Sequence, residues 1–220
     1  MSKRPALTRE RVVAAAVSVA DEGGLGRVTM RNVGAALGVE AMSLYHHIDG
    51  KEALLDALVE WIFARIEPPD PTEPWRPAMA ARAASARAVL SAHPWALGLI
   101  ESRRTPVVNL LDHHEAVLAN LRNDGFPVAL AAHAFSALDA YVYGFVLTEM
   151  NLPFEPGEGA EDFVEGVADA LGPGRYPHLA ELIGEQVVGR TYDYGDEFEF
   201  GLDLILDRLE QLLEAAPPTH

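Results

Sequence analysis

The residues that could do chemistry gather in one short stretch near the N-terminus. Four closely spaced side chains there carry hydrogen-bonding groups: Ser43, Tyr45, His46 and His47. They lie on the second of two short predicted helices within residues 29–47, with a turn at Gly38 between the helices. On the outward face of a helix, such side chains can reach base edges and phosphates in the DNA major groove. The layout therefore predicts a helix-turn-helix.

The two adjacent histidines do not form a convincing metal site. Neighbouring residues on a helix point in different directions, and no carboxylate lies at a matching spacing. The chain has no cysteine and none of the metalloprotease, nucleophile-elbow, Walker or dinucleotide-binding motifs. We therefore expect no metal, no cofactor and no catalytic residue. A helical enzyme, or an interaction module, that carries a helix-turn-helix-like hairpin is the alternative.

Small and apolar residues should hold the two short helices at a fixed angle. Thr29 is a candidate N-cap of the first helix, and Gly34 and Ala35 would allow a close approach to it. The predicted apolar contact between the helices comprises Val33, Ala36, Leu37, Val39 and Leu44. This contact would place the second helix in the major groove while the first crosses the DNA backbone.

Helical periodicity runs through the whole chain and strand patterns are nearly absent, so the predicted fold class is all-α. Thr8 and Gly23 should mark the two ends of the first helix. Further helices are predicted over residues 29–37, 41–47, 52–66, 79–93, 105–124, 127–151, 163–171, 179–188 and 196–214. The helix over residues 127–151 is apolar on nearly every side, which predicts burial from every direction. The last helix carries an apolar stripe of Phe198, Leu202, Ile205, Leu209 and Leu212.

The charge of the chain divides it into two parts. Its 220 residues carry a net charge of −16, which taken as a whole argues against a nucleic-acid partner. Residues 1–66, however, hold eight basic and eight acidic side chains, so the entire excess lies in residues 67–220. Four prolines within residues 67–74 interrupt any helix at the same place. We therefore predict a DNA-binding domain over residues 1–66, connecting helix included, and a second domain over residues 67–220.

Composition also bears on where the protein works. With 49% apolar residues, the chain can bury a sizeable core. The N-terminus lacks the apolar stretch of a signal peptide, and no run of about 18 uninterrupted apolar residues could span a membrane. We therefore expect a cytoplasmic protein with no membrane partner.

The most specific motif is Ser43-Leu44-Tyr45-His46-His47-Ile48 followed by Lys51. It resembles the recognition segment of the tetracycline repressor (TetR) family, and the resemblance is strong over residues 7–66. It continues where Asn123-Asp124-Gly125-Phe126 opens the long apolar helix and Phe198-Glu199-Phe200-Gly201-Leu202 opens the last one. The chain is identified as a member of this family with a tetracycline-repressor-like C-terminal domain.

The resemblance implies which residues meet DNA. Thr29 and Lys51 would hold phosphates on either side of the reading helix, and Arg31, beside Met30, would reach a base or phosphate edge. The recognition surface would comprise Ala41, Met42, Ser43, Tyr45, His46 and His47. Lys51 supports the assignment on its own, because a phosphate there would gain from both the lysine and the helix N-terminus. The alternatives are a solvated lysine at position 51 and a packing role for Tyr45.

Ala41 and Met42 depart from the polar side chains that could read bases at these two positions. Contact with a thymine methyl group is the option that their chemistry leaves. The operator is therefore expected to differ from that of the tetracycline repressor itself.

The resemblance also implies a small-molecule cavity between the helices of the second domain. Its candidate lining residues, each of which could equally be a core residue, are Trp95, Arg104, Leu110, His114, Phe135 and Leu138. Tetracycline-binding members carry a ligand histidine near the end of the fourth helix, where this chain has Arg65-Ile66-Glu67-Pro68, and a second one near Glu101. These differences argue against tetracycline as the inducer.

One short reading helix contacts few bases, so a specific regulator of this kind needs two-fold symmetry and a palindromic operator. The helices over residues 127–151 and 196–214 have more apolar surface than one small domain needs, and we expect them to form a four-helix bundle in a homodimer. Leu202 is predicted to lie in that interface. The sequence thus predicts a ligand-responsive dimeric transcriptional regulator, with repression as the family's usual mode and a small-molecule inducer.

Overall fold

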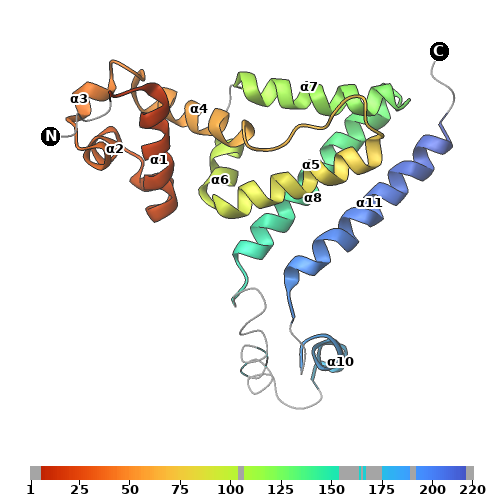
Figure 1. The fold of residues 1–220 in the computed structure, drawn as a ribbon. Coiled ribbons are helices and arrows are strands. Elements are labelled where there is room, and N and C mark those ends of the chain that lie inside the picture. Colours follow the sequence, from red (N-terminus) through yellow and green to blue (C-terminus); the bar gives the residue numbers. More distant parts are fainter. Residues whose placement is uncertain are drawn as a thin grey trace.

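The computed structural model describes residues 6–103, 107–153, 164, 166, 175–188 and 192–216. Every regular element within these residues is helical (Figure 1), which confirms the predicted all-α class. In chain order the elements are α1 (Arg9–Gly23), η1 (Leu25–Arg27), α2 (Met30–Leu37), α3 (Ala41–Leu44), α4 (Gly50–Phe63), α5 (Trp75–Ala92), α6 (Trp95–Ser102), α7 (Val108–Asn123), α8 (Val128–Met150), α10 (Pro177–Gln186), η2 (Tyr194–Asp196) and α11 (Glu197–Glu214).

The head, residues 6–58, is a small bundle of α1, α2, α3 and the first part of α4 (Figure 1). Both ends of α1 are as predicted: the Thr8 hydroxyl accepts a hydrogen bond from the Arg11 amide at 3.3 Å, and the helix ends at Gly23. Gly24 then takes a φ of 72° that favours glycine. The fully buried side chains that hold these helices together are Val12, Ala16, Val28, Val33, Leu44, Leu54 and Leu58.

The body, residues 67–216, is built around α8, which packs against α5, α7 and α11. Figure 1 shows α4 running from the head into the body, where it contacts α6 and α7. The largest fully buried side chains of the body are Met79, Leu90, Leu121, Phe126, Leu138 and Leu206. One helix therefore belongs to both packing units, and the head is attached to the body through it.

The proline-rich connection over residues 67–74 is strapped to the end of α7. The fully buried Asn120 donates hydrogen bonds to the carbonyl oxygens of Asp70 and Glu73, at 2.7 and 2.9 Å. The Asp124 carboxylate accepts from the amide of Trp75 at 2.6 Å. The connection is thus held against the body by hydrogen bonds, and it runs along α7.

Several helix boundaries differ from the sequence prediction. α5 begins at Trp75, four residues early, because Pro77 stands in the first turn, where helices tolerate proline. α4 starts two residues early and ends at Phe63, short of the predicted residue 66. α7 begins at Val108 with Val107 as its N-cap, while Thr105 and Pro106 lie outside the described residues. The predicted helix over 163–171 also lies outside them, except for residues 164 and 166.

Two burial predictions were wrong for the single chain. α8 buries one face only, and Val128 and Leu147 are 70% and 55% exposed. On α11 the buried stripe includes Leu206, whereas Leu212 is exposed, because the stripe follows the helical repeat from Leu202. By length and composition alone α8 could cross a membrane, with a mean hydropathy of 1.3. Its packing on three neighbouring helices is that of a core helix in a globular domain.

Candidate nucleic-acid interface and ligand-binding body

The helix-turn-helix depends on a glycine at a close backbone contact. A Cβ at Gly34 would stand 2.9 Å from the carbonyl oxygen of Val39 and 3.3 Å from the Cα of Ala41. Gly38 adopts a left-handed φ of 66° as the C-cap of α2, as its position in the turn predicted. The role predicted for Gly34 is therefore confirmed, whereas Ala35 is exposed and takes no part in the contact.

The apolar contact that supports α3 has four of its five predicted members. Val33 and Leu44 are fully buried, and Leu37 and Val39 pack against the same core from partly buried positions. Ala36 is exposed, so its predicted place in this contact was wrong. Val33 and Leu37 occupy the inward face of α2. A helix of about two turns buries only this narrow face, and Ala36 lies outside it.

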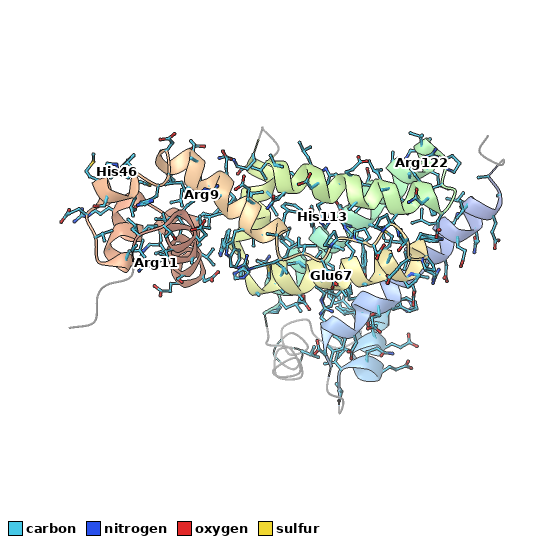
Figure 2. All side chains as sticks on the ribbon, turned by 45° about the horizontal axis from the view of Figure 1, so that its top comes forward. Arg9, Arg11, His46, Glu67, His113 and Arg122 are labelled. Atoms are coloured by element: carbon cyan, nitrogen blue, oxygen red, sulfur yellow. The ribbon has the colours of Figure 1, made fainter. Side chains whose placement is uncertain are left out.

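α3 ends at Leu44, three residues short of the predicted residue 47, and residues 45–47 form a turn after it. The outer side of α3 and of this turn, together called the α3 surface, presents the predicted recognition residues to solvent. Met42 is 72% exposed and Tyr45 is 47% exposed, and His46 is exposed as well. Ala41, Ser43 and His47 are partly buried at the same surface. Figure 2 shows His46 at the outer end of the head, far from the body. Tyr45 is thus about half exposed at this surface.

The predicted phosphate-binding residues lie beside this surface. The Thr29 hydroxyl caps α2 by accepting from the Asn32 amide at 3.1 Å, and its own hydrogen is left to donate. Arg31 is exposed, while the neighbouring Met30 packs partly into the core. Lys51 is exposed in the first turn of α4, whose N-cap Asp49 makes no side-chain capping bond. The Gly50 amide donates to the carbonyl oxygen of Ile48 at 2.9 Å, which leaves the next amides of the first turn to meet an anion beside the lysine.

The body contains a buried cluster of ionisable side chains between α5, α7 and α8. Arg82 Nε donates to His113 Nε2 at 2.8 Å, and Arg82 also pairs with Asp139 at 2.6 Å. Burial lowers the pKa of His113 to about 3, and the Arg82 charge contributes to this shift, so the imidazole is neutral and accepts the bond. Burial likewise raises the pKa of Tyr143 beside them. Figure 2 shows His113 among the helices of the body.

The residues predicted to line a ligand cavity are only partly brought together. His114 and Phe135 meet edge to face, with ring centroids 4.7 Å apart, and Leu138 is fully buried. Leu110 packs partly buried on the same core. Trp95 lies elsewhere, at the contact between α6 and α1, and Arg104 is outside the described residues.

A cavity of about 1100 Å³ opens between α5, the end of α8 and the start of α11. Its lining includes Arg87, Ser91, Glu149 and Phe198 and none of the six predicted ligand residues. The Arg87 guanidinium pairs with Glu149 and lies 4.9 Å from the centre of the Phe198 ring. Sequence reasoning missed this cavity because the paired residues are 62 positions apart and follow no motif. No group of metal-ligating side chains occurs within the described part of the chain.

The chain matches known proteins along most of its length. Residues 12–58 match the family of bacterial regulatory proteins of the tetR type, and residues 67–213 match the tetracycline repressor-like C-terminal domain. A transcriptional repressor of Streptomyces coeruleorubidus, DrrR1, is 35% identical over 97% of this chain and 83% of its own length. The class C tetracycline repressor of Escherichia coli is 28% identical over 94% of this chain and 92% of its own.

Solved structures agree with this assignment. Apo ActR of Streptomyces coelicolor superposes with a TM-score of 0.76 at 26% identity, covering 98% of this chain and all of that one. ActR in complex with actinorhodin gives a TM-score of 0.75 at 26% identity over 95% and 99% of the two chains. The enzyme alternative is thereby excluded. The chain belongs to the tetracycline repressor family: it is a ligand-responsive, dimeric transcriptional regulator with an operator-binding helix-turn-helix.

Proposed function

We propose that this protein is a repressor that leaves a palindromic operator when a small molecule binds its body. The observation that carries the proposal is the course of α4. Lys51, at its first turn, lies beside the recognition surface, and the ring of Phe63, at its last residue, lies 5.6 Å from the ring of His113. A change in the buried cluster therefore acts on the helix that carries a proposed phosphate contact. Residues 1–66 and 67–220 are the corresponding domains.

For DNA contact, we assign phosphates to Thr29, Arg31 and Lys51, with Met30 in a supporting place. Base edges and thymine methyl groups would meet the α3 surface formed by Ala41, Met42, Ser43, Tyr45, His46 and His47. The strong exposure of Met42 fits an apolar contact with a methyl group. The excess of acidic side chains in the body repels DNA, whereas the head has no net charge. DNA therefore approaches the head more favourably than the body.

For the ligand, we assign the region around His114, Phe135, Leu138 and Leu110, next to Arg82. Its aromatic edge and buried polar groups suit an organic molecule with a planar apolar part and hydrogen-bonding groups. ActR binds actinorhodin, and a TetR protein of Acinetobacter baumannii binds minocycline. Tetracycline remains disfavoured here, because Arg65-Ile66-Glu67-Pro68 stands where the tetracycline-binding members carry a ligand histidine.

For dimerisation, we assign the outward faces of α8 and α11. These faces carry Val128 and Leu147 on α8 and Phe200 and Leu204 on α11, all more than half exposed. Buried against a second copy, they would complete a four-helix bundle. Leu202 is unsuited to the interface because it is buried in the core of its own chain. We also place the protein in the cytoplasm, where its DNA partner lies.

The test is selection of bound duplexes from a random library with the full-length protein. A palindromic sequence with two half-sites is expected, and selection of no sequence at low salt would overturn the proposal. Leu204→Glu should give monomers in light scattering and weaken operator binding. Glu210→Gln, at an exposed position of α11, is the control and should stay dimeric. A stable dimer of Leu204→Glu would contradict the assigned interface.

A further inference from the structure

Helix α6 is attached to the head at its N-terminal end. The Trp95 indole donates its Nε1 hydrogen to Asp21 Oδ1 at 2.6 Å. The same carboxylate oxygen lies 2.8 Å from His93 Nδ1. Asp21 stands in the last turn of α1, while His93 and Trp95 form the corner between α5 and α6. One head carboxylate therefore holds two aromatic side chains of the body.

The corner is packed on its other side against α4. The rings of Trp61 and His93 meet edge to face at 4.9 Å between centroids, and the rings of His93 and Trp95 are 5.8 Å apart. Trp95 is 7% exposed, so the indole is fixed by packing as well as by its hydrogen bond. The position of Asp21 relative to the body is thus set by the buried indole of Trp95 and the partly buried rings of His93 and Trp61.

The C-terminal end of α6 is attached to a different helix of the head. Arg103, the C-cap of α6, donates to Glu52 Oε2 at 2.8 Å and also pairs with Asp56. Both carboxylates lie in the first two turns of α4, and Glu52 follows Lys51 directly. A helix of eight residues spans about 12 Å, so the two attachments are well separated along α6.

We propose that Asp21 and Arg103 are positioning residues that fix the orientation of the head on α6 and thereby the spacing of the two reading heads. α4 already joins the head to the body, and an attachment at one end of α6 alone would leave the other side of the head less restrained. Two attachments, on α1 and α4, restrain the head at both ends of α6. The inference rests on the proposed function, because head spacing matters only for a dimer that reads two half-sites. The inference goes beyond the proposed function because it includes a contact between α1 and α6, whereas the proposed function rests on α4 alone.

The first experiment measures head orientation without DNA. Because the chain has no cysteine, Ala14→Cys on α1 and Glu115→Cys on α7, both exposed, can be spin-labelled cleanly. Pulsed EPR on full-length protein, diluted with unlabelled chains, gives the distance between the two labels within one chain. Asp21→Ala and Arg103→Ala should each at least double the width of this distance distribution. Widths equal to those of the parent would overturn the proposal.

Matched variants separate positioning from folding. Trp95→Phe keeps an aromatic ring at the corner and removes the donated hydrogen together with part of the buried ring volume, so it should also widen the distribution. Asp21→Asn keeps an oxygen for Trp95 and should widen it less than Asp21→Ala. Glu22→Gln removes the same charge one residue along, at an exposed side chain on the same turn of α1, and should change nothing. Equal widening by Glu22→Gln would contradict the specific role of Asp21.

The second experiment uses the duplex that the parent protein selects. Its Kd is compared with that of duplexes in which one base pair is added or removed between the half-sites. The parent should discriminate at least tenfold, and Asp21→Ala and Arg103→Ala about threefold or less, with unchanged preference for the half-site sequence. Wider distance distributions with unchanged discrimination would overturn the proposal. Failure of the proposed function is distinct, because the parent protein would then select no duplex at all.

Discussion

The interiors of the head and the body differ in chemistry. Among the described residues, every buried side chain of the head is apolar, whereas the body also buries Arg82, His113 and Asn120. The head is held by hydrophobic packing around a glycine contact, which gives a fixed shape for reading DNA. The body buries polar and charged groups, and each of these lowers the stability of the fold unless it has a partner.

This difference separates two tasks. A reading head gains from rigidity, since the recognition surface must fit the groove in one geometry. A ligand-responsive body needs groups that can exchange one partner for another. In a buried charged network such an exchange changes the free energy strongly, because the surroundings screen the charges little. Four predictions test this difference, the first two in the body and the last two in the head.

Arg82→Ala should be the most destabilising change, because it leaves the buried His113 and the largely buried Asp139 carboxylate without their partner. We expect a decrease of about 3–5 kcal/mol in the free energy of unfolding. Arg76→Ala, on the same helix, removes an exposed pairing with Asp203, Asp207 and Glu210 and should cost about 1 kcal/mol or less. Urea denaturation of both variants checks this. Equal decreases in the two variants would show that the buried cluster contributes no more to stability than an exposed ion pair.

Acid should destabilise the body through His113. Its folded pKa of about 3 lies below the unfolded value of 6.5, so the unfolded chain takes up the proton first as the pH falls. Stability should therefore decrease by about 1.4 kcal/mol per pH unit from pH 6.5 downward. His113→Gln keeps an acceptor for Arg82 and should flatten this slope by one proton in urea denaturation. His178→Gln, at a fully exposed position, should leave the slope unchanged.

Gly34→Ala should destabilise the head by about 1–3 kcal/mol, because the neighbour at 2.9 Å is a backbone oxygen that has little room to move. Operator affinity should fall with it. Gly184→Ala in α10, where a Cβ meets nothing within 4 Å, is the control and should stabilise by up to about 1 kcal/mol. Thermal unfolding measures both. A neutral Gly34→Ala would contradict the rigid-head interpretation.

Lys51→Gln should have the smallest effect and only on DNA binding. The slope of log K against log salt concentration should become shallower by about 0.9 for each phosphate that the protein no longer neutralises. Arg122, which Figure 2 places at the end of the body far from His46, provides the control. Arg122→Gln should leave the slope unchanged in titrations with the selected duplex, and the same change in both variants would refute the role of Lys51.

Local features of the fold were predictable from sequence, and contacts between distant residues were not. Helix ends were predictable from the capping chemistry of Thr8, Thr29 and Gly38. The helical period likewise predicted that Val33 and Leu44 are core residues. By contrast, the residues of the Arg82–Asp139 pair are 57 positions apart, and Asp21 and Trp95 are 74 apart. Such pairs depend on how helices cross, which no single helix encodes.

The candidate site shows the same division. The outward residues of α3 could be predicted because a short motif fixes their face. The body residues could be predicted only by their place in the family pattern, so Trp95 was assigned to a cavity although its indole binds the head. The apolar surface of α8 was recognised, but one chain buries only one face of it, and we propose that a second copy covers the other face.

The strap over residues 67–74 limits how such a regulator can be cut or recombined. Because Asn120 and Asn123 donate hydrogen bonds to three of its backbone carbonyl oxygens, we expect the segment to resist proteolysis although most of its residues are exposed. A chimera joined at this segment would also leave α4 in contact with a foreign α6 and α7. Exchange of reading heads between relatives should therefore keep α4, the strap, α6 and α7 from one parent.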